Sequence, residues 1–410
     1  MLGAIADDFT GATDLAIMVR RNGYRVAVAI EDHDPGAQAR AGLDALVIAL
    51  KTRTAPVDEA VRASRAALGR LRHWGARQVY VKYCSTFDST DQGNIGPVLD
   101  AVADELGAER VVVAPSLPAN GRTVYHGHLF VGGDLLEHSS MRHHPLTPMT
   151  RSRVADLLRP QTPHAVAELH HETVRQGPEA VRAALAAESA RYVVVDTIDD
   201  EDLRVLGAAV ADSPLLSGGS GLACGLPARE SPADDWQSVP DTGRVVLCGS
   251  ASATTGRQIA TAARSQPVRR VDPRAAVHEP DAEVDRVVDW VRAQGPGRVP
   301  VVYAAGEPAD VVSEVDGQPV APAVEKVLAL TAQRLVSEAG VTRLLAAGGE
   351  TSGAIVRALG VGLLRIGPEI APGICWSGAV TDGGQEVALA LKSGNFGPDD
   401  LFTSAWDRLA

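Results

Sequence analysis

The sequence predicts an α/β protein in which two domains each contain a mostly parallel sheet flanked by helices. Short apolar, β-branched runs alternate with longer stretches of helical period, which is typical of βα units. At about 150 residues per domain, a chain of 410 residues suffices for two to three domains. A segment rich in proline and acidic residues interrupts the alternation at 227–243. We therefore expect domains at 1–226 and 244–410, joined by an exposed linker at 227–243.

The first domain is predicted to contain six strands, because six short runs are apolar and rich in β-branched residues. The runs are Leu2–Ala6, Val26–Ile30, Ala45–Leu50, Val79–Tyr83, Val111–Ala114 and Tyr192–Asp196. Between the first two, apolar residues at 12, 15, 16 and 19 have the spacing of a helix, and Asn22-Gly23 is a typical helix end. The same period at 61–71 predicts a second helix that closes at Gly75.

The second domain repeats this rhythm. Strands are predicted at Arg244–Cys248, Val299–Ala304, Leu344–Ala347 and Leu363–Ile366, and a helix at Val324–Glu338. No short-period repeat is present, which disfavours a solenoid.

The charge and composition exclude several classes of partner. With 39 basic and 51 acidic residues the formal charge is −12, so nucleic-acid phosphates and anionic membranes would repel the chain. No apolar run reaches the roughly 18 residues of a membrane span, and no signal peptide is evident. The four cysteines lie far apart without a CxxC pair, which disfavours a zinc cluster and a disulfide framework. We expect a cytoplasmic protein with small-molecule partners.

Ligand-binding residues are expected just after the strands, because ligands of parallel sheets bind at the carboxyl ends of the strands. Asp7 and Asp8 follow the first strand, where a carboxylate could bind a sugar hydroxyl and accept its proton. Capping of the next helix is the alternative role for Asp8, and the spacing leaves both open. Arg53 follows the third strand and Lys82 the fourth, and Ser85 adds a hydroxyl. Such cations suit a carboxylate substrate.

The stretch after the fifth strand contains Arg122, a further candidate for anion binding, and two histidines. His126 and His128 are two residues apart, which on a strand places both on one face and would suit a metal pair. No carboxylate or third histidine is closely spaced with them, so the sequence disfavours a metal there. The adjacent histidines at 143–144 and 170–171 are predicted to lie in loops.

Glycine-rich turns in the second domain predict a phosphate site. Residues 249–256 and 347–353 each follow a strand and open a helix, so their backbone N–H groups can face a phosphate. A third such stretch lies at 392–397. The lysine of the GxxxxGK[ST] motif is missing, so neither turn is a Walker A loop. A GxSxG elbow is missing around Ser220, which disfavours an acyl-transfer hydrolase.

These residues together predict a first domain that binds anions and hydroxyls and a second domain that binds phosphate. Phosphoryl transfer in the cleft between the domains is the resulting hypothesis, because that reaction needs positioning and charge neutralisation more than covalent chemistry. A sugar-acid-binding sensor without turnover is the alternative from a different functional class.

At the same residues the sequence resembles the four-carbon acid sugar kinase family, and most closely its 3-oxo-tetronate branch. The matching blocks extend from the first predicted strand to near the end of the chain: IADDFTGATD (5–14), KYCSTFDST (82–90), GNIGPV (93–98), GRTVYHGHLFV (121–131), HPLTPMT (144–150), GGSGLA (218–223), AGGETSGA (347–354) and LALKSGNFG (389–397). The loop GSASATT (249–255) departs from relatives that often carry a cysteine there, which leaves its backbone donors in place.

The resemblance implies an N-terminal acid-sugar-binding domain, a C-terminal ATP-binding domain, and phosphorylation of the 4-hydroxyl of a four-carbon sugar acid. By the match, the ATP-contacting residues are Ser250, Gly349, Glu350, Thr351, Ser352 and Gly394. For the substrate we choose Asp7, Arg53, Lys82, Ser85 and Arg122, on chemical grounds as much as on likeness. Asp8 is the candidate general base, with Asp7 and Asp88 as alternatives.

The resemblance also implies Mg²⁺ with ATP, although no cluster in the sequence identifies its protein ligands. Within the kinase class, a D-threonate or D-erythronate kinase is the alternative, because it differs by a hydroxyl in place of the 3-oxo group. The apolar composition permits a homodimer without demanding one.

Overall fold

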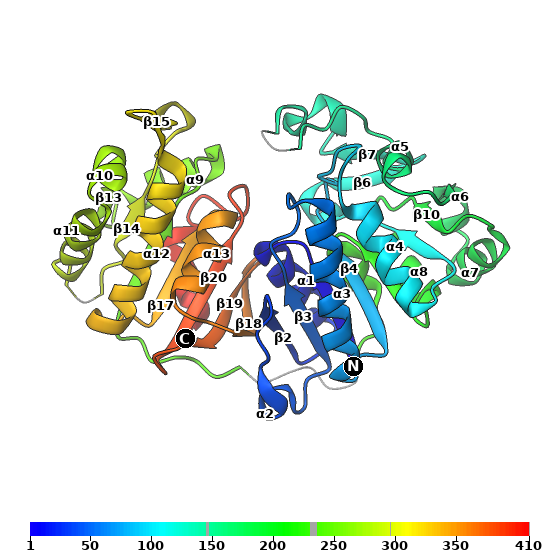
Figure 1. Cartoon of the computed structure of the whole chain (residues 1–410), viewed down its shortest axis with the longest axis horizontal. Coiled ribbons are helices and arrows are strands. Elements are labelled where there is room, and N and C mark those ends of the chain that lie inside the picture. The colour runs from blue at the N-terminus through cyan, green and yellow to red at the C-terminus, as the bar shows by residue number, and fades with distance from the viewer. Residues whose placement is uncertain (145–146, 230–235, 296, 410) are drawn as a thin grey trace. The chain divides into compact units, whose positions relative to one another are not determined.

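The computed structural model describes residues 1–144, 147–229, 236–295 and 297–409. The chain forms two compact units, Met1–Asp234 and Asp235–Ala410, and in each a mostly parallel sheet is flanked by helices (Figure 1). This confirms the predicted α/β class. Residues 230–235 of the predicted linker and residues 145–146 of the HPLTPMT block lie outside the described residues.

The main sheet of the N-terminal unit is parallel throughout. Its strands, in spatial order, are β11 (Leu215–Gly218), β4 (Gln78–Lys82), β1 (Leu2–Ala6), β3 (Ala45–Ala49) and β2 (Val26–Ile30). Every residue of β1, β2 and β3 is buried, as expected for parallel strands with both faces covered. The helices α1 (Phe9–Arg21), α3 (Val57–His73) and α4 (Ile95–Leu106) alternate with these strands along the chain, and α2 (Gly36–Arg40) is a short, largely exposed turn.

Two smaller sheets complete this unit. A parallel sheet contains β5 (Val111–Val113), β10 (Tyr192–Val195) and β9 (Val166–Leu169), and an antiparallel one contains β6 (Arg122–Tyr125), β7 (His128–Val131) and β8 (Asp134–Leu135). Their helices are α5 (Val154–Leu158), α6 (His171–Val174), α7 (Pro178–Ala187) and α8 (Asp200–Ala209).

The sheet of the C-terminal unit combines a parallel part with an antiparallel part. Its strands, in spatial order, are β18 (Leu363–Ala371), β19 (Ile374–Val380), β20 (Glu386–Lys392), β17 (Arg343–Ala347), β12 (Arg244–Cys248), β14 (Val301–Tyr303) and β13 (Val268–Arg270). Only the pairs β18–β19 and β19–β20 are antiparallel among the strands of this described sheet. A separate hairpin pairs β15 (Glu314–Val315) with β16 (Gln318–Pro319).

The helices of this unit are α9 (Ala253–Ala262), α10 (Pro273–His278), α11 (Pro280–Arg292), α12 (Val320–Ala339), α13 (Gly349–Ala358) and α14 (Leu401–Ser404). Within the described residues of the whole chain, no helix combines the length and the apolarity needed to cross a membrane.

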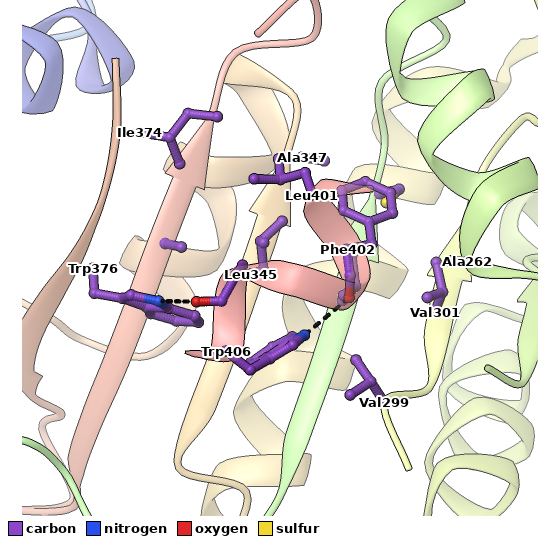
Figure 2. Close-up of a cluster of buried hydrophobic side chains, with 14 of the residues drawn as sticks. Ala262, Val299, Val301, Leu345, Ala347, Ile374, Trp376, Leu401, Phe402 and Trp406 are labelled. Carbon is purple, nitrogen blue, oxygen red and sulfur yellow. Dashed lines mark hydrogen bonds between the residues drawn. The ribbon is translucent and has the colours of Figure 1, made fainter. Parts of the chain in front are cut away.

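The core of the C-terminal unit follows directly from strand register. Val301, Val246, Leu345, Ala390 and Trp376 are paired in one row across five adjacent strands, so they share a face of the sheet. The last turns of the chain pack on this face as part of one buried cluster (Figure 2). The indole Nε1 of Trp376 donates to Ala405 O at 2.9 Å and that of Trp406 to Phe402 O at 2.9 Å, so both buried indoles are satisfied.

Most predicted elements are confirmed within two residues of their ends. The helix predicted at 324–338 spans 320–339. The strand predicted at 363–366 continues to 371, and its pairing with the antiparallel β19 extends to Ala371. The sequence reading missed β9, β11, β13, β19 and β20, the hairpin strands β15 and β16, and the three strands of the β6–β8 sheet. Buried and exposed residues alternate only weakly along β6 and β7, since most of these residues are partly buried.

The buried row predicts which substitution destabilises the C-terminal unit. Phe402 is fully buried against the row, so Phe402→Ala should lower the free energy of unfolding by about 3–5 kcal/mol through lost burial and a cavity. Val380 on β19 is 55% exposed, and Val380→Ala should stay within about 0.5 kcal/mol of the parent. Urea denaturation followed by tryptophan fluorescence measures both. Equal stability of the two variants would contradict the assigned core.

Candidate functional site

The first site of the N-terminal unit forms where three neighbouring strands end at one level. The backbone N–H of Asp7 donates to Lys82 O at 3.1 Å, and the N–H groups of Thr52 and Arg53 donate to Asp7 O at 2.9 and 3.2 Å. The segments that follow β1 and β3 therefore stay paired beyond the strands, and Asp7 is also bonded to the last residue of β4. Residues 46 and 75 positions apart from Asp7 are brought to it by this pairing alone.

The side chains of these segments form an ionic group. Arg53 Nε and Nη2 donate to the two oxygens of Asp7 at 2.9 and 2.8 Å, and Nη2 lies 2.9 Å from Asp8 Oδ1. Asp8 also caps α1, because its Oδ1 accepts from Gly11 N at 2.8 Å. The hydroxyl of Thr10 donates to Asp8 Oδ2 at 3.1 Å. The capping role of Asp8 is thus present, and it leaves the carboxylate beside the guanidinium.

Burial and charge act in opposite directions on the two carboxylates. Burial raises the pKa of Asp7 above its ordinary value, despite the bonds to Arg53. Burial also opposes ionisation of Asp8, but the charges of Arg53 and Lys82 outweigh it and lower the pKa of Asp8. The buried Lys82 ammonium donates to Tyr83 O at 2.9 Å. Burial also raises the pKa of Asp14, which lies six residues after Asp8 in α1.

Two residues hold this group in place. Asn94 Nδ2 donates to Thr52 O at 2.6 Å and to the carbonyls of Arg53 and Ala55 at 3.3 Å, so one amide fixes the loop that carries the guanidinium. A Cβ on Gly11 would lie 2.2 Å from Asp8 Oδ1 and 3.1 Å from Lys82 Nζ. Only glycine allows the first turn of α1 to approach the two charged groups this closely.

In the C-terminal unit, two helices begin at the ends of adjacent parallel strands. Ser252 caps α9 after β12, and its hydroxyl accepts from Thr255 N at 3.2 Å. Helix α13 begins after Gly348, whose φ of +123° favours glycine. The two turns pack closely, since a Cβ on Gly249 would lie 2.0 Å from Thr351 Oγ1. Two helix N-termini side by side provide N–H groups and positive potential for a phosphate.

A buried lysine completes this second site. Lys392 Nζ, at the end of β20, donates to Thr255 Oγ1 at 2.9 Å and to Gly394 O at 2.8 Å. Thr255 Oγ1 in turn lies 3.2 Å from Ser250 Oγ. Burial lowers the pKa of Lys392 to about 8, and the two groups that its ammonium contacts, a hydroxyl and a carbonyl, are neutral. A cation among neutral dipoles is suited to an incoming anion.

Known proteins match the chain over its whole length. The protein-family model described as a sugar-binding N-terminal domain matches residues 2–226, and the one described as a nucleotide-binding C-terminal domain matches residues 245–402. A 3-oxo-tetronate kinase of Pseudomonas fluorescens is 45% identical over 100% of this chain and 97% of its own. The chain belongs to the four-carbon acid sugar kinase family. A 3-oxo-tetronate kinase of Salmonella typhimurium is 42% identical over 98% of each protein.

Solved structures agree with this family. A crystal structure from Salmonella typhimurium LT2, under the provisional name of a tRNA synthase, has a TM-score of 0.90 at 41% identity and 98% coverage of both chains. A protein of Haemophilus influenzae has a TM-score of 0.81 at 38% identity over both full chains. The chain is therefore a kinase with a nucleotide-binding C-terminal domain.

The structure brings most of the predicted site residues of this kinase together in two sites. The site in the N-terminal unit contains Asp7, Asp8, Arg53 and Lys82. The site in the C-terminal unit contains Ser250, Thr351 and Gly394. Gly349 and the exposed Glu350 lie in the first turn of α13, whereas the buried Ser352 hydroxyl donates to Ala346 O at 3.4 Å. Among the described residues, Ser85 and Arg122 form no hydrogen bond or ion pair with the Asp7–Arg53 group.

The sequence analysis placed Lys392 and Thr255 in the predicted phosphate-binding stretches 392–397 and 249–256, and Asn94 in the GNIGPV block, but assigned none of the three a role of its own. Lys392 ends the apolar run ALALK as Lys82 ends VYVK, so the same signal was available. Its role as a strand-end cation was not identified, because β20 was not recognised as a strand. Thr255 and Asn94 carry no sequence signal of their own, since their roles depend on segments more than 40 residues away.

The expected geometry of the first histidine pair is wrong. His126 lies in the two-residue turn between β6 and β7 with a φ of +46°, so it does not share a strand face with His128. His128 Nδ1 lies 2.8 Å from His126 O instead. A two-residue hairpin turn of this kind needs positive φ at both central residues, and Asn-Gly is its usual sequence. The His-Gly sequence found here did not indicate the turn.

Lys392 leads to a prediction about protons. A nucleotide phosphate beside Lys392 favours the ammonium form, so it raises this pKa from about 8 and the kinase should take up protons on binding nucleotide above about pH 8. Nucleotide affinity should accordingly fall as the pH rises through this range. Isothermal titration in buffers of different ionisation enthalpy measures the uptake.

The matched variants are Lys392→Met, which should abolish the uptake, and Lys326→Met at an exposed position of α12, which should retain it. Equal uptake by the parent and by Lys392→Met would refute the assignment of Lys392 to the phosphate site.

Proposed function

We propose that this kinase transfers the γ-phosphoryl group of ATP to the 4-hydroxyl of a 3-oxo-tetronate, giving the 4-phosphate. The observation that carries the proposal is that each unit has its own charged site at strand ends. Residues 1–226 would bind the sugar acid beside Asp7, Asp8 and Arg53, and residues 244–410 would bind ATP beside Lys392. Relatives that match the whole chain and carry the name 3-oxo-tetronate kinase support this substrate.

Arg53 is our candidate for the substrate carboxylate. Its Nε and Nη2 are engaged by the two aspartates, and Nη1 makes none of the contacts described for the chain, which leaves two N–H groups for an incoming anion. Lys82 adds positive charge at the next strand end. Ser85 and Arg122 remain proposed contacts that a bound sugar acid would have to reach.

Asp8 is our candidate general base. Its lowered pKa keeps it ionised at neutral pH, and its Oδ2 accepts only the Thr10 hydroxyl among the contacts described. Asp7 is the weaker candidate because both of its oxygens are paired with Arg53, and Asp88 already accepts from the Thr86 hydroxyl at 2.5 Å. The base has a modest task, since phosphoryl transfer relies mainly on positioning and charge.

ATP would bind along the first turns of α9 and α13. Ser250, Gly349, Thr351, Ser352 and Gly394 are the proposed contacts, with Lys392 as the neutralising charge. Mg²⁺ would neutralise the β- and γ-phosphates when bound with ATP. Glu350 fits it, because an exposed carboxylate in the first turn of α13 can join the phosphate oxygens and water that Mg²⁺ prefers.

Substrate identity is tested by ATP consumption with Mg²⁺ and a panel of 3-oxo-tetronates, threonates and erythronates. We expect turnover of the 3-oxo acids and a loss of at least about 100-fold in kcat for Asp8→Asn, as for removal of a positioned base. Asp58→Asn, on the exposed first turn of α3, is the control and should behave like the parent. Preference for threonate or erythronate would overturn the substrate, and binding without turnover would favour the sensor.

Arg53 gives a separate prediction on affinity. Arg53→Lys should raise KM for the sugar acid about 10- to 100-fold, since charged hydrogen bonds contribute about 1.5–3 kcal/mol and lysine cannot bind two partners in a fork. KM for ATP should stay constant. Arg62→Lys, on the exposed surface of α3, is the matched control. An unchanged KM for the sugar acid would remove Arg53 from the substrate site.

A homodimer and a cytoplasmic location stay predictions. The mass of the purified protein by light scattering tests the first, and fractionation of cells tests the second.

A further inference from the structure

A second strand-end cluster lies in the N-terminal unit, at the ends of β9 and β10. His170 follows β9 and Asp196 follows β10, and these two strands are parallel neighbours. The β6–β7 turn, which contains His126, is bonded to Asp196. The main-chain pairing thus brings together three side chains that are separated by up to 70 residues in the sequence.

The three side chains are spaced as metal ligands. One donor atom from each of His126, His170 and Asp196 lies within 4.8 Å of the others, and His170 Nδ1 is 3.7 Å from Asp196 Oδ2. Ligand atoms that share one ion at bond lengths of about 2.0–2.2 Å lie roughly 3–4 Å apart, so small side-chain rotations would close the site. Glu172 offers a further oxygen, 3.7 Å from His126 Nε2.

The backbone of the turn is held in an unfavourable conformation. His126 has a φ of +46° and Gly127 one of +72°, and a non-glycine residue in this region costs about 1 kcal/mol. Asp196 holds the turn, since it accepts from the N–H groups of His126, Gly127 and His171 at 2.7, 2.9 and 3.0 Å. The imidazole at this position therefore carries a conformational cost that glycine or asparagine would largely avoid.

Anchoring of the turn explains the buried carboxylate but not the imidazoles. His170 Nδ1 is shielded from solvent and has no hydrogen-bond partner among the described residues, although it faces a carboxylate oxygen. The rings of His126 and His170 are 5.1 Å apart between centroids, and both side chains remain 40–50% exposed, so an ion could reach them. A bound cation would satisfy the free nitrogen and join both rings to the carboxylate.

We propose that His126, His170 and Asp196 form a binding site for a divalent transition-metal ion, with Glu172 as an additional oxygen donor. Two imidazoles and one carboxylate match the donor set of Zn²⁺ sites with three protein ligands, whereas Mg²⁺ and Ca²⁺ prefer oxygen alone. The ion would link the β6–β7 hairpin, through His126, to the residues that follow β9 and β10. This hairpin carries Arg122, so the ion would restrict a segment that also contributes a predicted anion-binding residue.

The test is Zn²⁺ binding by untagged, chelator-treated full-length protein, measured by isothermal titration and by metal content after dialysis. We expect one Zn²⁺ per chain, not displaced by excess Mg²⁺, and a visible spectrum of imidazole-bound Co²⁺ on substitution. His170→Asn should weaken binding by more than the roughly 10- to 100-fold that loss of an outer partner costs. His128→Asn, in the same hairpin, is the matched control and should bind like the parent.

Hydrogen exchange provides a readout of structure that does not depend on activity. Zn²⁺ should slow exchange of residues 122–131 in the parent and in His128→Asn, and should leave His170→Asn unchanged. Thermal unfolding of the metal-free variants verifies that each is folded before binding is compared. Equal Zn²⁺ affinity of His170→Asn and the parent, or binding of Zn²⁺ without any change of exchange in the hairpin, would overturn the proposal.

Discussion

The parallel pairing of β1 with β3 and β4 is the constraint on which the N-terminal site depends. Because the three strands end at one level, Asp7, Arg53 and Lys82 emerge side by side from distant parts of the sequence. Backbone bonds continue past the end of β1, because Asp7 N donates to Lys82 O at the end of β4 and Asp7 O accepts from Thr52 N in the loop after β3. The guanidinium therefore meets two carboxylates on a rigid backbone, which removes much of the entropic cost of holding charged side chains together.

The two units place a buried lysine at the same point of their sheets but surround it differently. Lys82 lies near the carboxylates of Asp8 and Asp14, so its charge is balanced within the protein. Lys392 contacts a hydroxyl and a carbonyl, and its burial among these neutral groups lowers its pKa. One lysine thus stabilises a permanent ionic group, and the other is suited to an anion that arrives and leaves.

Apolar runs sufficed to predict the α/β class and most strands of the parallel parts, because fully buried strands such as β1 and β3 carry the strongest signal. They did not suffice for β6 and β7, whose partly buried residues give little contrast. In the sites, residues directly after a strand were predictable from topology alone, as Asp7 and Arg53 illustrate. The contact of Thr255 with Lys392 and the contact of His126 with His170 depend on how distant segments pack, which local residue spacing cannot predict.

Asn94 connects the start of α4 to the loop that carries Arg53. It immediately precedes α4, and its single amide binds three carbonyls of the loop that presents Arg53. Any substitution that shifts the start of α4 by a fraction of an ångström must also move that loop. Residues that pack against α4 can therefore control the position of the Arg53 guanidinium without contacting it.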